Sequence, residues 1–264
     1  MSNEVPYTSR KPVVFIHGAW MTPACWDPFT TVFEAAEYRV LAPAWPFIDG
    51  PAAALRSHPP AGLGSMTVGT IVDHYARIIN TLPVPPLIIG HSFGGLVAQL
   101  LLDRGIGRAG VAVAPAPFAG IVPDGTTLAG ALPILLRWNG WNRPYTISHQ
   151  HFAMNFANTV DAASQQAAFE RLVVPTSGRI FYQAATGIGL VIHPKERLQP
   201  LLIIEGEMDR TVTPSMARTA FEKQRKSPSR TDFKQFAGRS HFILSEPGWE
   251  EVADYALNWA ENLV

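Results

Sequence analysis

Short runs of apolar residues alternate along the chain with stretches in which apolar residues recur every three or four positions. The runs have the length of strands and the stretches between them have the period of a helix, a pattern typical of parallel sheets built from strand–helix–strand units. The expected strands cover residues 12–16, 38–42, 87–89, 109–114, 201–205 and 231–236. We therefore expect an α/β fold with a doubly wound, mainly parallel sheet of about six strands.

Helix signals stand between the apolar runs. Asp27 followed by Pro28 has the form of a helix cap and a first-turn proline, and Thr213 followed by Pro214 has the same form. Residues 68–82 carry apolar side chains at helical spacing with few exceptions. These segments are expected to supply helices that pack on the sheet.

Two stretches break the alternation. Residues 43–64 are rich in proline, glycine and alanine, and we expect a long surface loop there. Residues 115–200 are rich in aromatic side chains and would lie over the carboxyl edge of the sheet, where α/β proteins bind ligands. We expect residues 1–114 and 201–264 to form the core and residues 115–200 to form an inserted helical cap. A peripheral helical subdomain with its own aromatic core is the alternative.

The bulk composition narrows the partners and the compartment. The chain has 264 residues, of which 47% are hydrophobic and 16% charged, as suits one domain with a large buried sheet. Its 21 basic and 21 acidic residues balance, so no net field favours nucleic acid or an anionic membrane. Cys25 is the only cysteine, which excludes an internal disulfide. The first ten residues lack an apolar signal core and no apolar stretch could span a bilayer, so we expect a soluble cytoplasmic protein. A homodimer is among the oligomeric states left open.

The segment Gly90-His91-Ser92-Phe93-Gly94 carries the strongest chemical signal in the chain. It places a serine between two glycines, directly after an apolar strand and directly before a helical pattern, which is the form of a nucleophile elbow. The glycines allow strand and helix to pass closely, and the serine is forced into a strained backbone conformation that exposes its hydroxyl. The alternative is an ordinary turn in which Ser92 caps the helix.

An acid and a histidine follow in the loops after two later strands. Asp209 comes just beyond the run at 201–205, and His241 lies between the last strand and the last helix. The chain order Ser92, Asp209, His241 resembles that of the α/β-hydrolase superfamily, in which these three residue types form a catalytic triad.

Three segments carry the resemblance over nearly the whole chain. Residues 15–20 look like the family's oxyanion segment, residues 206–209 like its acid loop, and residues 238–241 like its histidine loop. Ser240 departs from the family pattern, because a glycine more often precedes the histidine. The chain lacks the leading hairpin of many members, which implies a sheet of about six strands rather than eight.

The resemblance implies a role for each residue. Ser92 would be the nucleophile, His241 the base that takes its proton, and Asp209 the group that orients the imidazole. The backbone N–H groups of Ala19 and Phe93 would hold the developing oxyanion. No organic cofactor and no metal is needed for this chemistry.

Substrate-contacting residues are expected around the oxyanion donors and in the cap. Trp20 flanks the donors and is expected to form a pocket wall, and His17 is expected to brace the oxyanion segment and to contribute to substrate binding. Trp138 and Trp141 either face the substrate or belong to the core of the cap.

Other candidate groups have weaker signals. Glu207 shares a loop with Asp209, but the spacing from the strand favours Asp209 as the acid. His149 and His151 lie in the cap, and a surface or substrate-lining role fits them better than metal binding, since no third ligand stands at suitable spacing. No phosphate-binding signature is present, so a nucleotide site is not expected.

The leading functional hypothesis is a hydrolase that cleaves a carboxylic ester, lactone or related acyl bond of an apolar small molecule through an acyl-serine intermediate. A lyase, a perhydrolase or a cofactor-free oxygenase on the same scaffold is the first alternative. A ligand receptor derived from a hydrolase is the second, and fold alone does not distinguish these classes.

Overall fold

A central parallel sheet organises the computed structural model, which describes residues 10–263. In that range the sheet has six strands in the order β2-β1-β3-β4-β7-β8, and each neighbouring pair is parallel. The strands are β1 (Pro12–Ile16), β2 (Arg39–Leu41), β3 (Leu87–His91), β4 (Ala109–Val113), β7 (Leu201–Gly206) and β8 (Thr231–Phe236). The expected α/β fold with about six parallel strands is therefore confirmed. The expectation about a signal core rests mostly on residues 1–9, which lie outside the described residues.

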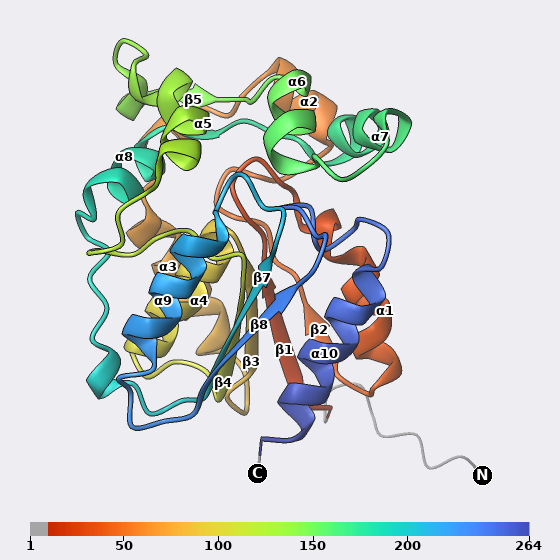
Figure 1. The fold of residues 1–264 in the computed structure, drawn as a ribbon, viewed down its shortest axis with the longest axis vertical. Helices are drawn as coiled ribbons and strands as arrows, with labels where there is room; N and C mark the ends of the chain where they lie inside the picture. The colour runs from red at the N-terminus through yellow and green to blue at the C-terminus, as the bar shows by residue number, and fades with distance from the viewer. Residues whose placement is uncertain (1–9, 264) are drawn as a thin grey trace.

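Helices cover both faces of the sheet (Figure 1). One face carries α1 (Asp27–Ala35) and α10 (Trp249–Glu261), and the other carries α3 (Val68–Ile79), α4 (Phe93–Asp103) and α9 (Pro214–Gln224). Because both faces are covered, the four inner strands are buried along their whole length, which is why they appear in the sequence as unbroken apolar runs. The edge strands β2 and β8 are mostly half-buried.

The inner strands end level with one another. Ile16 pairs with Gly90, and Val113 pairs with both His91 and Ile204. The loops that leave β1, β3, β4 and β7 therefore begin at one edge of the sheet. This edge holds the expected oxyanion segment, the serine elbow and the acid loop.

The segment between β4 and β7 lies across that edge and forms a cap over it (Figure 1). Its elements are α5 (Gly125–Leu135), β5 (Pro144–Tyr145), α6 (His149–His151), α7 (Ala162–Leu172), β6 (Thr176–Ser177) and α8 (Arg179–Thr186). β5 and β6 pair as a small antiparallel ribbon. The layer above the sheet is thus built mainly of short helices.

Residues 43–64 are not the plain surface loop that their composition suggests. They contain the helix α2 (Ala52–Ser57), which lies beside α7 in the cap layer. Ile48, Leu55 and Leu63 are buried there, and these apolar side chains anchor a stretch whose prolines and glycines favour turns. A segment from the core half of the chain therefore helps to build the cap.

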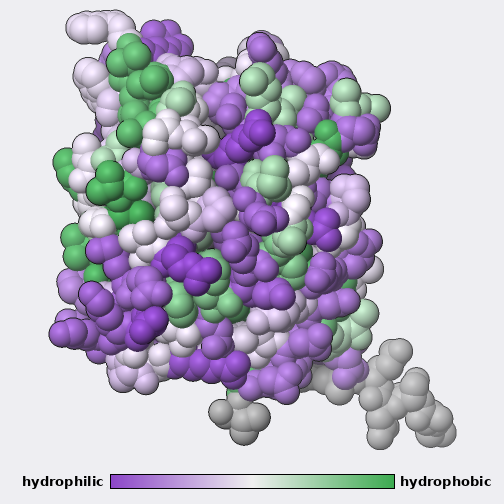
Figure 2. Space-filling view, in the orientation of Figure 1, coloured by the Kyte–Doolittle hydropathy of each residue, from purple (hydrophilic) through white to green (hydrophobic). Residues whose placement is uncertain are grey.

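Apolar side chains are exposed on the outer side of the cap. Figure 2 shows them gathered over the upper left of the molecule, where Figure 1 places α5 and β5. Leu136 is 79% exposed, Trp138 is 86% exposed and Trp141 is 45% exposed. Within residues 10–263 no helix is both long enough and apolar enough to cross a bilayer.

Candidate active site

Ser92 stands at the apex of a sharp turn between β3 and α4. Its backbone has φ 56° and ψ −121°, a strained conformation for a residue with a side chain. A Cβ on Gly90 would lie 2.0 Å from the carbonyl oxygen of Gly94, and a Cβ on Gly94 would lie 2.0 Å from that of Ile16. The two glycines are thus required by close backbone approach, as the sequence predicts. The side chain of Ser92 forms no cap hydrogen bond with α4, which excludes the capping alternative.

His241 and Asp209 meet in the loops that follow β8 and β7. His241 Nδ1 donates a hydrogen bond to Asp209 Oδ2 at 2.5 Å, and both side chains are buried. Asp209 Oδ1 accepts from the backbone N–H groups of Thr211 and Val212 at 2.7 and 2.9 Å. Because the Asp209 carboxylate accepts the hydrogen on Nδ1, it fixes the tautomer of the His241 ring, and Nε2 carries a lone pair. That Nε2 is buried and has no hydrogen-bond partner within residues 10–263.

His91 links the histidine loop to the elbow. Its Nε2 donates to the backbone carbonyl of His241 at 2.9 Å, and the two imidazole rings lie 4.6 Å apart. Burial holds the pKa of His91 well below its usual value, so the ring is neutral. Because Ser92 is the next residue, this contact brings the His241 ring to the side of the elbow.

The expected oxyanion donors flank Ser92. Ala19 and Phe93 line the same pocket as the serine. Neither backbone N–H donates a hydrogen bond to another turn or loop of the described chain, and the first N–H groups of a helix have no acceptor within it. A Cβ on Gly18 would lie 2.8 Å from the Cβ of Ser92, so the glycine lets this segment approach the serine. The arrangement offers two free donors beside one hydroxyl.

His17 braces the oxyanion segment from behind. Its Nδ1 donates to the Gly18 carbonyl at 2.9 Å, and its Nε2 accepts from the Trp45 N–H at 3.0 Å. Burial lowers the pKa of His17 to about 4, so the ring is neutral near pH 7. The ring is buried and is not part of the pocket lining. The expectation that His17 contributes to substrate binding is therefore corrected, because both of its nitrogens are already engaged.

The three tryptophans expected near the substrate lie in two different places. Trp20 lines the pocket, where its ring stacks on Phe181 with centroids 4.7 Å apart. Trp138 and Trp141 are exposed and lie outside the pocket lining. Trp141 packs edge-on against Tyr182 on the outside of the cap, with centroids 5.9 Å apart. The expectation that Trp138 and Trp141 face the substrate is corrected, and so is the alternative that they lie in the core of the cap, since both side chains are exposed and neither lines the pocket.

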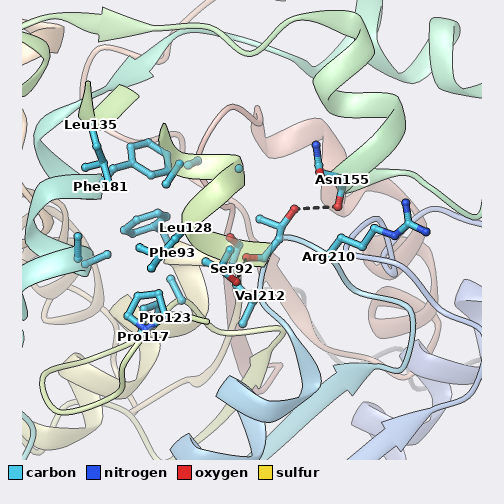
Figure 3. Close-up of a pocket in the computed structure, with 18 of the residues that line it drawn as sticks. Ser92, Phe93, Pro117, Pro123, Leu128, Leu135, Asn155, Phe181, Arg210 and Val212 are labelled. Carbon is cyan, nitrogen blue, oxygen red and sulfur yellow. Dashed lines mark hydrogen bonds between the residues drawn. The ribbon is translucent and has the colours of Figure 1, made fainter. Parts of the chain in front are cut away.

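A pocket opens at Ser92 between the sheet edge and the cap. Figure 3 shows Phe93, Leu128 and Phe181 on one side of the serine, and Asn155 and Arg210 on the other. The lining is mostly apolar and includes Ala19, Trp20, Ala116, Pro117, Pro123, Ala131, Leu135, Ala184, Ala185 and Val212. A pocket of this kind favours a ligand with an apolar group.

Most of the lining was not identified from the sequence. Phe181 stood among the aromatic residues of the cap without a feature that set it apart, and Leu128 and Val212 gave no signal. Their role depends on which face of a cap helix or loop turns toward the serine, and periodicity does not define that face in short elements.

Glu246 is a supporting residue that the sequence did not indicate. Its carboxylate accepts from the backbone N–H of Ser240 at 2.8 Å and from the Ser240 hydroxyl at 2.8 Å. The hydroxyl of Thr159 in the cap also donates to it. Ser240 in place of the usual glycine is thus part of a hydrogen-bonded loop that holds His241.

The remaining candidate groups lie at the margins of the site. Glu207 is exposed and accepts a hydrogen bond from the Gly238 N–H at 3.0 Å, whereas Asp209 accepts the hydrogen bond from His241. His151 lines the pocket, and burial lowers its pKa. Within residues 10–263 no three His, Cys, Asp or Glu side chains gather as a metal site requires.

Comparison with known proteins identifies related folds. A family model described as "Alpha/beta hydrolase family" matches residues 13–255. The chain is similar to a monoacylglycerol lipase from Paleococcus ferrophilus (20% identity, 94% of this chain and 93% of that chain covered, TM-score 0.68).

Two further solved structures are similar over nearly their whole length. One is a pyrethroid hydrolase from Sphingobium faniae JZ-2 (18% identity, 96% and 98% covered, TM-score 0.71). The other is a methylesterase from Arabidopsis (14% identity, 96% and 100% covered, TM-score 0.69). No curated protein sequence matches the chain. Identities this low establish a shared fold and carry no information on substrates.

Proposed function

The chain belongs to the alpha/beta hydrolase family, and on that basis we propose that it is a serine hydrolase that cleaves a carboxylic ester, lactone or related acyl bond. The observation that carries the proposal is the hydrogen bond from His241 Nδ1 to Asp209, which leaves Nε2 as an unpartnered base beside the elbow. A serine hydroxyl needs such a base in order to attack at neutral pH.

The proposed reaction has two half-reactions. Ser92 Oγ attacks the substrate carbonyl while its proton passes to His241 Nε2, and the resulting oxyanion accepts hydrogen bonds from the N–H groups of Ala19 and Phe93. The tetrahedral intermediate collapses, and His241 returns the proton to the departing alcohol oxygen. Water then attacks the acyl-serine with His241 as base, which releases the carboxylic acid and restores the hydroxyl of Ser92.

The shape of the pocket supports an apolar small substrate. The side walled by Phe93, Leu128 and Phe181 suits an apolar acyl or alcohol group. Known hydrolases with a similar fold include a lipase, a pyrethroid hydrolase and a methylesterase, and an ester substrate agrees with these neighbours. No cofactor takes part in the proposed chemistry.

A panel of para-nitrophenyl esters from acetate to decanoate, with simple lactones, tests the proposal on the wild type and on Ser92→Ala. We expect multiple turnover by the wild type and a loss of at least about 10³-fold in kcat for Ser92→Ala. The chain-length profile then measures the depth of the pocket.

The alternatives predict different results in the same assay. A single burst of product equal to the amount of enzyme would favour a ligand receptor over an enzyme. Labelling of Ser92 by a fluorophosphonate without turnover of any ester would favour a lyase, perhydrolase or oxygenase on this scaffold. Absence of labelling would overturn the nucleophile assignment itself.

A further inference from the structure

Glu205 is a buried carboxyl group behind the proposed triad that the reaction scheme does not use. It is the penultimate residue of β7, in the interior of the sheet, and its side chain is completely buried. An ionised carboxylate in such a place is strongly disfavoured unless donors or a cation compensate it. No lysine or arginine forms an ion pair with Glu205 in the described chain.

The two oxygens of Glu205 receive little compensation from the protein. One accepts from the backbone N–H of Gly206 at 3.0 Å, and the other, Oε2, is buried and accepts no hydrogen bond from any donor within residues 10–263. The Asp209 carboxylate is much better compensated, because it accepts hydrogen bonds from Thr211 N, Val212 N and His241 Nδ1.

The carboxyl group of Glu205 lies within hydrogen-bonding reach of the carboxylate of Asp209. Two carboxyl groups in contact are not both ionised, because the like charges repel, so the pair holds one proton. The proton resides on the group with fewer donors, which is Glu205. Burial first, and the charge of Asp209 second, raise the pKa of Glu205 well above its usual range.

The other titratable groups nearby do not change this assignment. His241 binds Oδ2 of Asp209, and His91 lies beside His241 with a ring kept neutral by burial. Neither ring donates to Glu205.

We propose that Glu205 is a positioning residue that keeps its proton at neutral pH and donates a carboxylic-acid hydrogen bond to Asp209. The role rests on the proposed function, since it acts through Asp209 on His241. A fourth donor disperses the negative charge of Asp209 and fixes the orientation of its carboxylate. Glu205 holds its proton throughout the catalytic cycle, and no proton passes between the two carboxyl groups.

Two substitutions separate this role from simple packing. Glu205→Gln retains both a donor toward Asp209 and an acceptor for the Gly206 N–H, whereas Glu205→Leu retains the volume and removes the donor. We expect Glu205→Gln to keep the wild-type kcat within about twofold and the wild-type pH profile. In Glu205→Leu we expect kcat to fall roughly tenfold with KM unchanged.

The pH profile gives the decisive kinetic readout. Without the donor the charge on Asp209 is less dispersed and favours the protonated imidazole of His241 more strongly. The acidic limb of kcat/KM is therefore expected to move to higher pH by about half a unit or more in Glu205→Leu and to stay in place in Glu205→Gln. An acidic limb of the kcat/KM profile that stays in place in both variants would overturn the proposal, whatever the change in kcat.

Infrared difference spectroscopy near pH 7 tests the protonation state without any substrate. The wild type should show the carbonyl stretch of a protonated carboxyl that disappears in Glu205→Gln. Glu246→Gln is the matched control, because Glu246 is also buried but its carboxylate accepts three hydrogen bonds. The protonated-carboxyl band should therefore persist in the Glu246→Gln protein. Absence of the band from the wild type would refute the proposal, and this result does not require the Glu205→Leu protein to fold. The band does not depend on turnover. The infrared experiment therefore tests the protonation of Glu205 independently of the ester assay, which tests the hydrolase proposal.

Discussion

At the scale of single residues, Ser92 depends on neighbours that have no side chain. The elbow brings the backbone at Gly90 to the backbone at Gly94, and Gly94 in turn to the end of β1. The pattern of two glycines around a serine predicts this geometry because the steric requirement is local in sequence. Strain at φ 56° is sustained by backbone hydrogen bonds, including the one from Ser92 N–H to the Val113 carbonyl at 2.9 Å.

Gly94→Ala should therefore disrupt both the fold and the site. The new methyl group would lie 2.0 Å from the Ile16 carbonyl oxygen and 2.6 Å from that of His17, so β1 and α4 must separate. We expect the free energy of unfolding, measured with urea, to fall by about 3 kcal/mol or more.

Gly69→Ala is the matched control for this substitution. Gly69 lies in the first turn of α3, and the nearest atom to a Cβ there is the Thr67 hydroxyl at 3.6 Å. The free energy of unfolding should rise by up to about 1 kcal/mol, because alanine favours the helix more than glycine does. A Gly94→Ala protein as stable as the wild type would contradict the close contact.

The carboxyl groups of the site were only partly predictable at this scale. The position of Asp209 just after a strand predicts that its side chain reaches the edge of the sheet that holds Ser92, because strand ends in a parallel sheet meet at one edge, and the structure joins it to His241 there. Glu205 ends the same apolar run, and nothing in the sequence says whether its side chain meets Asp209 or a cation. Glu246 lies six residues from Ser240, and their contact depends on the path of a loop that has no regular period.

At the scale of elements, the cap helices have one side on the pocket and another in water. α8 places Phe181 against Trp20 and Phe93, with ring centroids 4.7 and 5.1 Å away. The chain after α5 instead carries Trp138 on the outside. Both aromatic residues stand in the same aromatic-rich stretch, and only packing separates their roles.

Phe181→Ala and Trp138→Ser test this separation. Removing the Phe181 ring opens the apolar side of the pocket, so KM for the medium-chain para-nitrophenyl esters should rise roughly tenfold. Trp138→Ser should leave kcat and KM within about twofold for every ester, because the side chain is 86% exposed and is not part of the pocket lining. A similar change in chain-length preference in both variants would show that the pocket is assigned to the wrong face of the cap.

At the scale of the whole molecule, the cap is held by hydrogen bonds between residues more than a hundred positions apart in the sequence. Arg56 of α2 donates to the carbonyls of Val173 and Glu170 at 2.6 and 3.1 Å. These carbonyls lie at the carboxyl end of α7, where a cation compensates both the free acceptors and the helix dipole. The connection closes one side of the cap over the edge of the sheet.

Arg56→Met should loosen the cap without weakening the sheet. Loss of a charged donor to the carbonyls at the end of α7 is expected to speed hydrogen exchange in α7 by roughly tenfold, while amides in β3 and β4 keep their protection. Exchange detected by mass spectrometry measures both regions in one experiment.

Arg77→Met on the exposed side of α3 is the control, since no hydrogen bond of Arg77 to the cap exists in the described chain. It should leave exchange in α7 unchanged. Equal acceleration in α7 and in the sheet after Arg56→Met would mean that the cap and the core unfold as one unit.

The sequence by itself determined the parallel sheet, the elbow and the order of Ser92, Asp209 and His241. Each of these follows from a local pattern: an apolar run with both faces buried, a glycine spacing, or a position just past a strand. Only the tertiary structure decided that Phe181 and not Trp138 walls the pocket, that residues 43–64 join the cap, and that Glu205 lies against Asp209. These outcomes depend on side-chain packing in the folded chain, which local periodicity does not specify.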